Sequence, residues 1–102
     1  MSRVQVSVPR DAIADFCRRW QVRELSLFGS VVREDFGPDS DIDVLVSFTP
    51  EAPWSLADLA EMREELMALF GREVDLVERE ALRNPFRRHS ILTRREIIHA
   101  AG

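Results

Sequence analysis

The chain has 102 residues, of which 45% are hydrophobic and 31% charged, and its formal net charge is −4 at pH 7. This length fits one domain over residues 1–102 and leaves no room for a second, acceptor-binding domain. The mild acidity argues against a general nucleic-acid surface, which is usually basic. With no apolar run near the roughly 20 residues of a membrane span and no signal sequence, we expect a cytoplasmic protein that binds neither membranes nor nucleic acid stably.

Gaps in the composition exclude further kinds of chemistry. The single cysteine, Cys17, cannot form an internal disulfide or a cysteine zinc site. The chain has no lysine, which excludes a Walker A loop and Schiff-base catalysis. It has no tyrosine, so it cannot be its own tyrosyl acceptor.

The first predicted helix begins near Pro9, a residue that suits the first turn of a helix. An apolar face follows at the spacing i, i+3, i+4 and i+7, formed by Ile13, Phe16, Cys17 and Trp20. We expect this helix to cover a sheet, with packing roles for Cys17 and Trp20. The first strand of the sheet is predicted from Glu24 to Phe28.

A glycine and a serine end this strand. Gly29 lets the chain turn sharply and lets a ligand approach the backbone, because no Cβ is in the way. Ser30 suits the N-cap of a short helix over residues 31–34, whose free N–H groups would form an anion site. Arg33 could contact phosphate or could equally be a helix-surface charge. The turn from Gly37 to Ser40 brings the chain back.

Two aspartates open the next predicted strand, Asp41 to Phe48. Alternation along a strand places Asp41 and Asp43 on one face, with Cβ atoms roughly 6.6 Å apart. Two ionised carboxylates at that separation repel by about 2.5 kcal/mol at an effective dielectric near 20. A hard divalent cation with oxygen ligands would offset this cost.

A second helix is predicted from Leu56 to Phe70, with Ser55 and Asp58 as a capping box and Gly71 at its end. We expect its outer face to be solvated and to consist of Glu61, Glu64 and Glu65. A strand from Glu73 to Val77 follows, and the strand-helix-strand connection favours parallel pairing with the preceding strand. Its lone Asp75 reads most simply as a surface aspartate at a strand end.

After Leu82 the chain becomes basic, with Arg83, Arg87, Arg88, Arg94 and Arg95. Pro85 can open a short helix through about Leu92, and Ile97-Ile98 can form a small strand or a final turn. Two interpretations of the arginines stay open with equal weight. They could grip a triphosphate, nucleic acid or an acidic partner, or they could be a solvated face that balances the acidic second helix.

The spacing of Gly29-Ser30, ten residues, and Asp41-x-Asp43 resembles the signature of the DNA polymerase beta-like nucleotidyltransferase superfamily. Residues 28–46, together with the later run from Val74 to Val77, are similar to its small stand-alone branch, the MNT (minimal nucleotidyltransferase) antitoxins that accompany HEPN toxins. The similarity extends from about Arg10 to His99. It implies a single α+β domain with a small mixed sheet covered by helices.

The resemblance also implies a site and a reaction. Asp41, Asp43 and Asp75 would be catalytic and would hold two Mg²⁺ ions about 3.5–4 Å apart. Gly29, Ser30 and Arg33 would bind the nucleotide. Family members transfer AMP from ATP to a tyrosine of the cognate HEPN ribonuclease toxin and so disable it. One departure concerns the phosphate loop, because Glu34 stands where relatives often carry glycine.

Two other functions remain alternatives. The domain could be a non-catalytic antitoxin that neutralises the toxin by binding it. It could also be a nucleotidyltransferase that modifies RNA ends through its arginine-rich segment. The acidic net charge favours protein modification over the RNA alternative.

Overall fold

The computed structural model describes residues 8–29, 37 and 40–100. Its elements follow in the order α1 (Arg10–Arg19), β1 (Val22–Phe28), β2 (Ile42–Phe48), α2 (Leu56–Phe70), β3 (Val74–Glu78), a short 3-10 helix η2 (Arg79–Ala81), α3 (Pro85–Arg94) and β4 (Glu96–Ala100). All the helices and strands predicted within the described ranges are therefore present, and their boundaries differ by a few residues.

The strands form one sheet in the order β3-β2-β1-β4. β1 runs antiparallel to both β2 and β4, whereas β2 and β3 are parallel. The parallel pair is connected through α2, as the strand-helix-strand order predicts. The sheet is therefore mixed, and the expected α+β class is confirmed.

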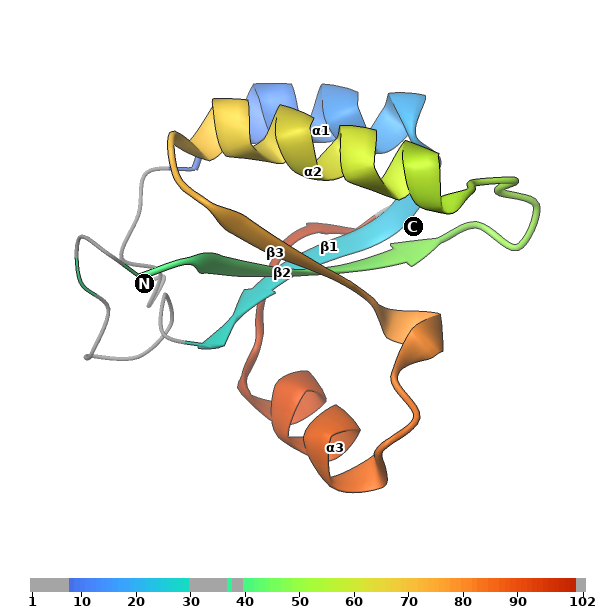
Figure 1. Cartoon of the computed structure of the whole chain (residues 1–102), viewed down its shortest axis with the longest axis vertical. Coiled ribbons are helices and arrows are strands. Elements are labelled where there is room, and N and C mark those ends of the chain that lie inside the picture. The colour runs from blue at the N-terminus through green and yellow to red at the C-terminus, as the bar shows by residue number, and fades with distance from the viewer. Residues whose placement is uncertain (1–7, 30–36, 38–39, 101–102) are drawn as a thin grey trace.

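The two faces of the sheet are covered unequally. α1 and α2 lie side by side on one face, and α3 lies against the other (Figure 1). The main core lies under α1 and α2 and includes Ile13, Phe16, Met62, Leu66, Leu25, Leu27, Ile42, Val44 and Val46. Within the described part of the chain, a smaller apolar cluster packs α3 on the sheet, formed by Phe28, Leu45, Leu82 and Ile91. The α3 face can therefore carry polar side chains close to the sheet.

α2 begins and ends at the predicted residues. The Ser55 hydroxyl accepts a hydrogen bond from the Asp58 N–H at 3.3 Å, and the Asp58 carboxylate accepts one from the Ser55 N–H at 2.9 Å. Gly71 ends the helix in the left-handed region, with φ of 68°. Between these two ends, the helix buries Met62, Leu66 and Phe70 on its core face.

Three strands have boundaries that differ from the predicted ones. β1 begins at Val22 instead of Glu24, because Val22 is buried and pairs with Phe48 of β2. β2 begins one residue later, at Ile42, and β3 is shifted by one residue to Val74–Glu78. The segment around Ile97-Ile98 is strand β4, which pairs with β1.

The prediction of a fully solvated outer face for α2 is wrong at Glu65. The indole N–H of Trp20 donates to the Glu65 carboxylate at 2.9 Å, and the Arg19 guanidinium also donates to it. The hydrogen bond from Arg19 holds the pKa of the Glu65 carboxyl below its usual value. These contacts tie α1 to α2. Cys17 is buried as expected, and burial raises the pKa of its thiol to about 12.

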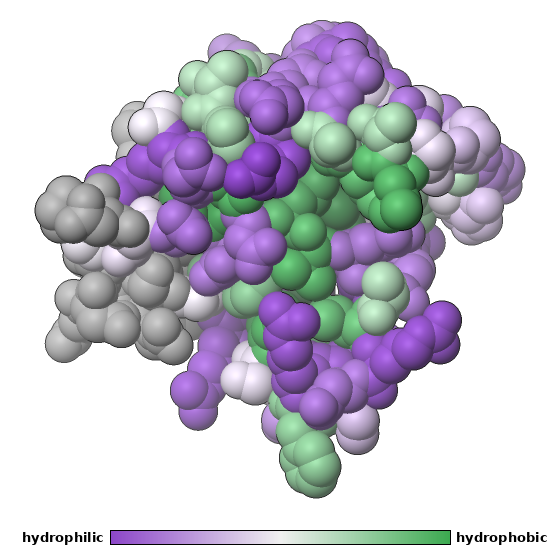
Figure 2. All heavy atoms as spheres, viewed as in Figure 1, coloured by the Kyte–Doolittle hydropathy of each residue, from purple (hydrophilic) through white to green (hydrophobic). Residues whose placement is uncertain are grey.

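Figure 2 shows where apolar and hydrophilic side chains lie on one face of the molecule. Apolar groups are exposed between α2 and the edge strand β3, where Leu56, Leu59, Ala60 and Leu76 line a shallow pocket of about 260 Å³. Hydrophilic side chains dominate around α3. None of the described helices is both long enough and apolar enough to cross a membrane.

Replacing Phe16 tests the main core. Phe16 has no exposed surface, so Phe16→Ala should lower the free energy of unfolding by about 3–5 kcal/mol. Leu56 is 85% exposed, and Leu56→Ala should change it by less than about 0.5 kcal/mol. Guanidinium denaturation measures both, and equal losses in the two variants would contradict this assignment of the core.

Candidate active site

The candidate site lies where β1 ends and β2 begins. Phe28, the last residue of β1, pairs with Asp43 of β2, and Gly29 follows directly. Gly29 has φ of 73°, a conformation that L-residues with a side chain rarely adopt. A Cβ added there would overlap Oδ2 of Asp43 and would lie 3.0 Å from its Cγ. The Asp43 carboxylate therefore sits directly against the backbone of the glycine turn.

Asp75 lies next to Asp43 on the neighbouring strand. The two aspartates are directly paired in the parallel register of β2 and β3. Adjacent strands are about 4.8 Å apart, and paired residues point to the same face. That is the α3 face, because the alternate residues Val44 and Val74 lie in the core under α1 and α2. Asp43 is half-buried and Asp75 is exposed.

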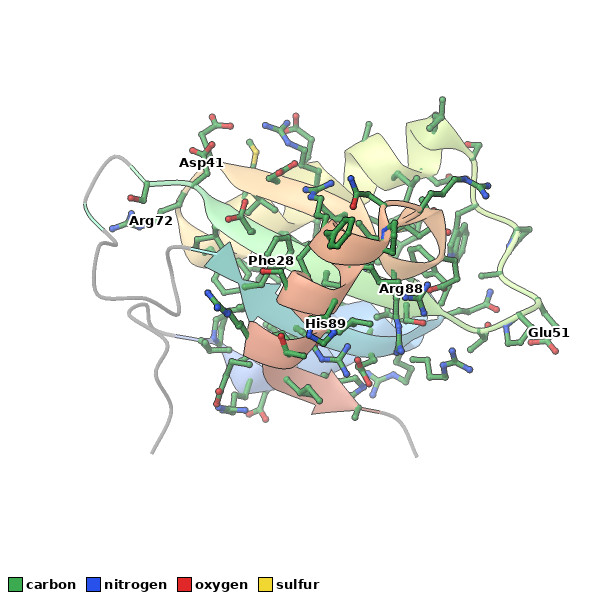
Figure 3. The ribbon with its side chains drawn as sticks, turned by 90° about the horizontal axis from the view of Figure 1, so that it is seen from below. Phe28, Asp41, Glu51, Arg72, Arg88 and His89 are labelled. Atoms are coloured by element: carbon green, nitrogen blue, oxygen red, sulfur yellow. The ribbon has the colours of Figure 1, made fainter. Side chains whose placement is uncertain are left out.

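Asp41 lies just outside β2 and is exposed. The neighbouring Ile42 N–H donates to the Glu73 carbonyl at 2.9 Å, which anchors this end of β2 to the entry of β3. Figure 3 looks onto the α3 side and shows Asp41 and Phe28 toward one end of the sheet, with Arg88 toward the other. Asp41 is thus at the same end as Asp43, and its predicted part in metal binding stays a prediction.

The carboxylates at the candidate site fit a Mg²⁺ ion that arrives bound to a phosphate ligand. Within the described ranges, no group of three or more His, Cys, Asp or Glu side chains is already placed to hold a metal ion. Mg²⁺, however, is usually bound by one or two carboxylates together with substrate phosphates and water, rather than by a complete protein cage. Asp43 and Asp75 supply carboxylate oxygens from adjacent strands, and the pocket lined by Gly29 and Asp43 offers space for phosphate beside them.

Several predicted site residues lie outside the described residues. These are Ser30 and Arg33, as well as Glu34 and the short helix predicted over residues 31–34. The end of the loop is described at Gly37 and Ser40, where the Ser40 N–H donates to the Gly37 carbonyl at 3.1 Å. Arg72 donates to the carbonyls of both residues, at 2.9 Å and 3.2 Å. Arg72 thus helps to hold the chain at Gly37 and Ser40, just before β2. The sequence does not predict this role, because Arg72 is far from both residues along the chain.

A pocket of about 280 Å³ opens at the candidate site. Its floor on the sheet is formed by Phe28, Gly29 and Asp43, and its wall on α3 by Arg87, Ser90, Ile91 and Arg94. The four α3 residues have the spacing i, i+3, i+4 and i+7, which places them on one side of the helix. The spacing of these four residues can be read from the sequence, but it does not indicate which strands this side of α3 faces.

The basic segment does not form ion pairs with the acidic α2 among the described residues. α3 lies on the opposite side of the sheet from α2 (Figure 1), and none of the ion pairs between described residues connects the two helices. Arg95, just after α3, instead pairs with Glu24 of β1 at 2.8 Å. Direct pairing with α2 is thus not seen among the described residues, but Arg83, Arg87, Arg88 and Arg94 are exposed, as a solvated face requires. Both interpretations of the arginines stay open.

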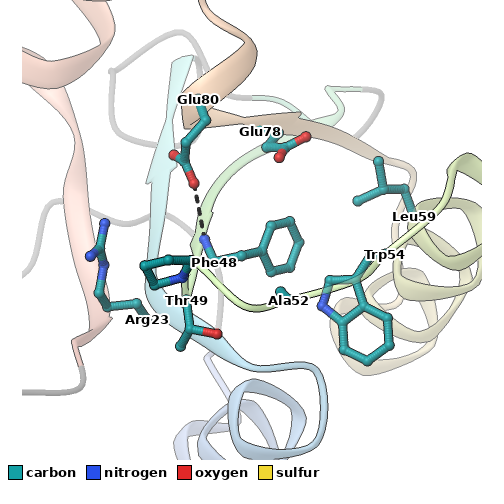
Figure 4. A pocket seen from close by; sticks show the side chains of 9 residues that line it. Arg23, Phe48, Thr49, Ala52, Trp54, Leu59, Glu78 and Glu80 are labelled. Atoms are coloured by element: carbon teal, nitrogen blue, oxygen red, sulfur yellow. Dashed lines mark hydrogen bonds between the residues drawn. The ribbon is translucent and has the colours of Figure 1, made fainter.

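A larger pocket, about 330 Å³, lies at the other end of β2 (Figure 4). Phe48 and Trp54 lie on one side of it and Glu78 and Glu80 on another. The Glu80 carboxylate accepts hydrogen bonds from the Ser47 hydroxyl at 3.1 Å and the Phe48 N–H at 3.2 Å. Glu80 thus fixes the end of β2, and the predicted aspartates are not part of this pocket.

Comparison with known proteins agrees with the geometry. The profile of the nucleotidyltransferase domain matches residues 10–98. Protein adenylyltransferase MntA of Thermococcus cleftensis is 47% identical over 66 residues, which is 65% of this chain and 65% of that protein. A proposed protein adenylyltransferase of Methanocaldococcus jannaschii is 36% identical over 73 residues, 72% of each chain.

Solved structures show the same fold. One protein, proposed to be a minimal nucleotidyltransferase, aligns with a TM-score of 0.69 and 34% identity over 84% of this chain and 85% of its own. A toxin-antitoxin crystal structure with AMP-PNP aligns with a TM-score of 0.74 over 92% of this chain and 75% of its own, at 19% identity. The latter similarity concerns the fold alone.

The fold and the paired aspartates beside a glycine turn define a small nucleotidyltransferase domain. The chain belongs to the nucleotidyltransferase domain family. The resemblance to minimal nucleotidyltransferases and the fold expected from it are confirmed. The alignment spans less than two thirds of the Thermococcus protein's own length. The reaction and the substrates of the present chain are therefore proposed below.

Alanine at the two positive-φ glycines separates backbone strain from contact with Asp43. Gly29 and Gly71 have φ of 73° and 68°, so each alanine should cost about 1–2 kcal/mol in stability. Only Gly29→Ala displaces Asp43, whereas nothing lies within 4 Å of a Cβ at Gly71. We expect Gly29→Ala to slow nucleotidyl transfer about 10²-fold or more and Gly71→Ala to leave it unchanged.

Urea unfolding and the rate of label transfer from nucleotide measure the two effects. Equal transfer rates in the two glycine variants would contradict a positioning contact between Gly29 and Asp43.

Proposed function

We propose that this protein is a Mg²⁺-dependent adenylyltransferase that transfers AMP from ATP to a tyrosine hydroxyl of a cognate HEPN-family toxin, and so acts as its antitoxin. The observation that carries the proposal is the contact of Asp43 with the Gly29 turn, in register with Asp75. Two carboxylates that could bind a metal ion thereby lie at the pocket lined by Gly29. The role belongs to the cytoplasm, where ATP and RNA are found.

The comparisons support the choice of acceptor and nucleotide. Similar proteins are named protein adenylyltransferase. Structures with the same fold include a toxin-antitoxin crystal structure with AMP-PNP and a tri-AMPylated Shewanella oneidensis HEPN toxin in complex with an MNT antitoxin. The absence of tyrosine from this chain requires that a tyrosyl acceptor come from a partner.

The proposed reaction needs positioning more than covalent catalysis. The acceptor oxygen bonds to the α-phosphorus of ATP, the bond from that phosphorus to the bridging oxygen of the β-phosphate breaks, pyrophosphate leaves, and the hydroxyl proton passes to water. Bound Mg²⁺ would neutralise triphosphate charge and lower the pKa of the attacking hydroxyl.

The chain's own part in this reaction is to place the reactants. Asp41, Asp43 and Asp75 would provide the metal ligands, and Gly29 would admit the phosphates to the backbone. Ser30 and Arg33 remain predicted nucleotide-binding residues. Asp43 is half-buried between Gly29 and the residues of α3, and partial exclusion of water strengthens its interaction with a bound cation.

Intact-mass analysis tests the proposal. The protein is incubated with ATP, Mg²⁺ and the HEPN-type product of the adjacent gene, and the partner should gain one or more AMP units. Asp43→Asn should slow this gain by about 10²-fold or more, because it removes a charge from the metal site. Glu61→Gln is the matched control, since Glu61 is an exposed acid on α2, on the other side of the sheet.

The same experiment separates enzyme from binding module. If Asp43→Asn still neutralises the toxin in cells as well as the wild type does, neutralisation occurs by binding and the proposal is wrong. A partner whose mass never changes with the wild-type protein would also contradict it.

One observation favours RNA ends as a second acceptor class. Phe86, at the start of α3, is 85% exposed and stands next to Arg87 and Arg88. Exposed aromatic and guanidinium groups together are typical of single-strand binding. Labelled nucleotide on RNA ends, with binding that weakens steeply with salt, would support this function.

A further inference from the structure

The arginines around α3 face different neighbours. Arg87 and Arg94 line the pocket that contains Gly29 and Asp43. Arg88, one residue from Arg87, lines a separate cavity of about 270 Å³ together with Ser47 and Glu80. The helix therefore presents one selected pair of guanidinium groups to the candidate active site.

The selected pair is available for a ligand. Arg87 and Arg94 are both exposed, and neither forms an ion pair with any carboxylate among the described residues. They are two helical turns apart, about 10.5 Å along the axis, and their long side chains flank Ser90 and the buried Ile91. Two unneutralised cations on one pocket wall favour an anion that extends between them.

The opposite wall of the pocket carries the opposite charge. Asp43 lies across from the two arginines, against Gly29. A simple anion would be attracted by the arginines and repelled by Asp43. A polyphosphate that carries its own divalent cation satisfies both walls, because its metal faces the carboxylate and its phosphate oxygens face the guanidinium groups. Arginine suits this contact, since its planar fork binds phosphate oxygens in pairs.

We propose that Arg87 and Arg94 are nucleotide-binding residues that clamp the phosphates of the metal-nucleoside triphosphate from the α3 side, with the Ser90 hydroxyl between them as a further donor. This inference rests on the proposed nucleotidyltransferase function and adds a second wall to its nucleotide site. α3 then does more than cover the sheet, because it supplies positive charge where negative charge accumulates on the leaving pyrophosphate.

Calorimetry with a non-hydrolysable ATP analogue tests the clamp without depending on the acceptor. Arg87→Gln and Arg94→Gln should each weaken binding of the magnesium complex of the analogue about 10-fold, and should affect adenosine much less. Arg88→Gln is the matched control, one residue away on the same helix, and should bind like the wild type. Thermal unfolding confirms that each variant is folded, as expected for exposed side chains.

The outcomes separate the clamp from the proposed function. Unchanged analogue binding in both Arg87→Gln and Arg94→Gln would overturn the clamp, even if the wild-type protein modifies its partner. Equal weakening in Arg88→Gln would also overturn it, because the effect would then come from the general charge of α3. Selective weakening at Arg87 and Arg94 would support the clamp even if no AMP reaches the toxin.

Discussion

The contact between the Gly29 backbone and the Asp43 carboxylate is the constraint on which the site depends. It exists because β1 ends in register with Asp43 of β2, and because a left-handed glycine leaves no side chain between them. Any Cβ at this position would take the space of the carboxylate oxygen. The same contact places the acidic strand end beside the glycine turn and the pocket there, so the proposed metal ligands and the proposed nucleotide site share one location.

The two faces of the sheet are covered unequally, and this allows aspartates on one face without loss of the main core. Most of the buried apolar residues lie between the sheet and the helices α1 and α2, so the α3 face can carry Asp43 and Asp75 without disrupting the main core. The small cluster around Ile91 is sufficient to dock α3, and it leaves arginines on both flanks of that helix exposed. Most of the apolar core thus lies on one face of the sheet, and the proposed active site lies on the other.

Much of this could be predicted from local patterns in the sequence. Strand alternation and the spacing from Gly29 to Asp43 are local, and the capping residues Ser55 and Gly71 set the length of α2 directly. The place of α3 could not be predicted, because it depends on tertiary packing of Ile91 against Phe28, far away in the sequence. The polar role of Glu65 was missed for the same reason, since only packing of α1 against α2 brings Trp20 to it.

A crystal structure with Mn²⁺ and a non-hydrolysable ATP analogue tests the central claim most directly, because anomalous scattering locates the metal without assumptions about the nucleotide. The account predicts a metal peak within coordination distance of Asp43 and Asp75, with the triphosphate between Gly29 and α3. Metal bound away from both carboxylates, or nucleotide seated instead in the pocket lined by Phe48 and Trp54, would contradict it.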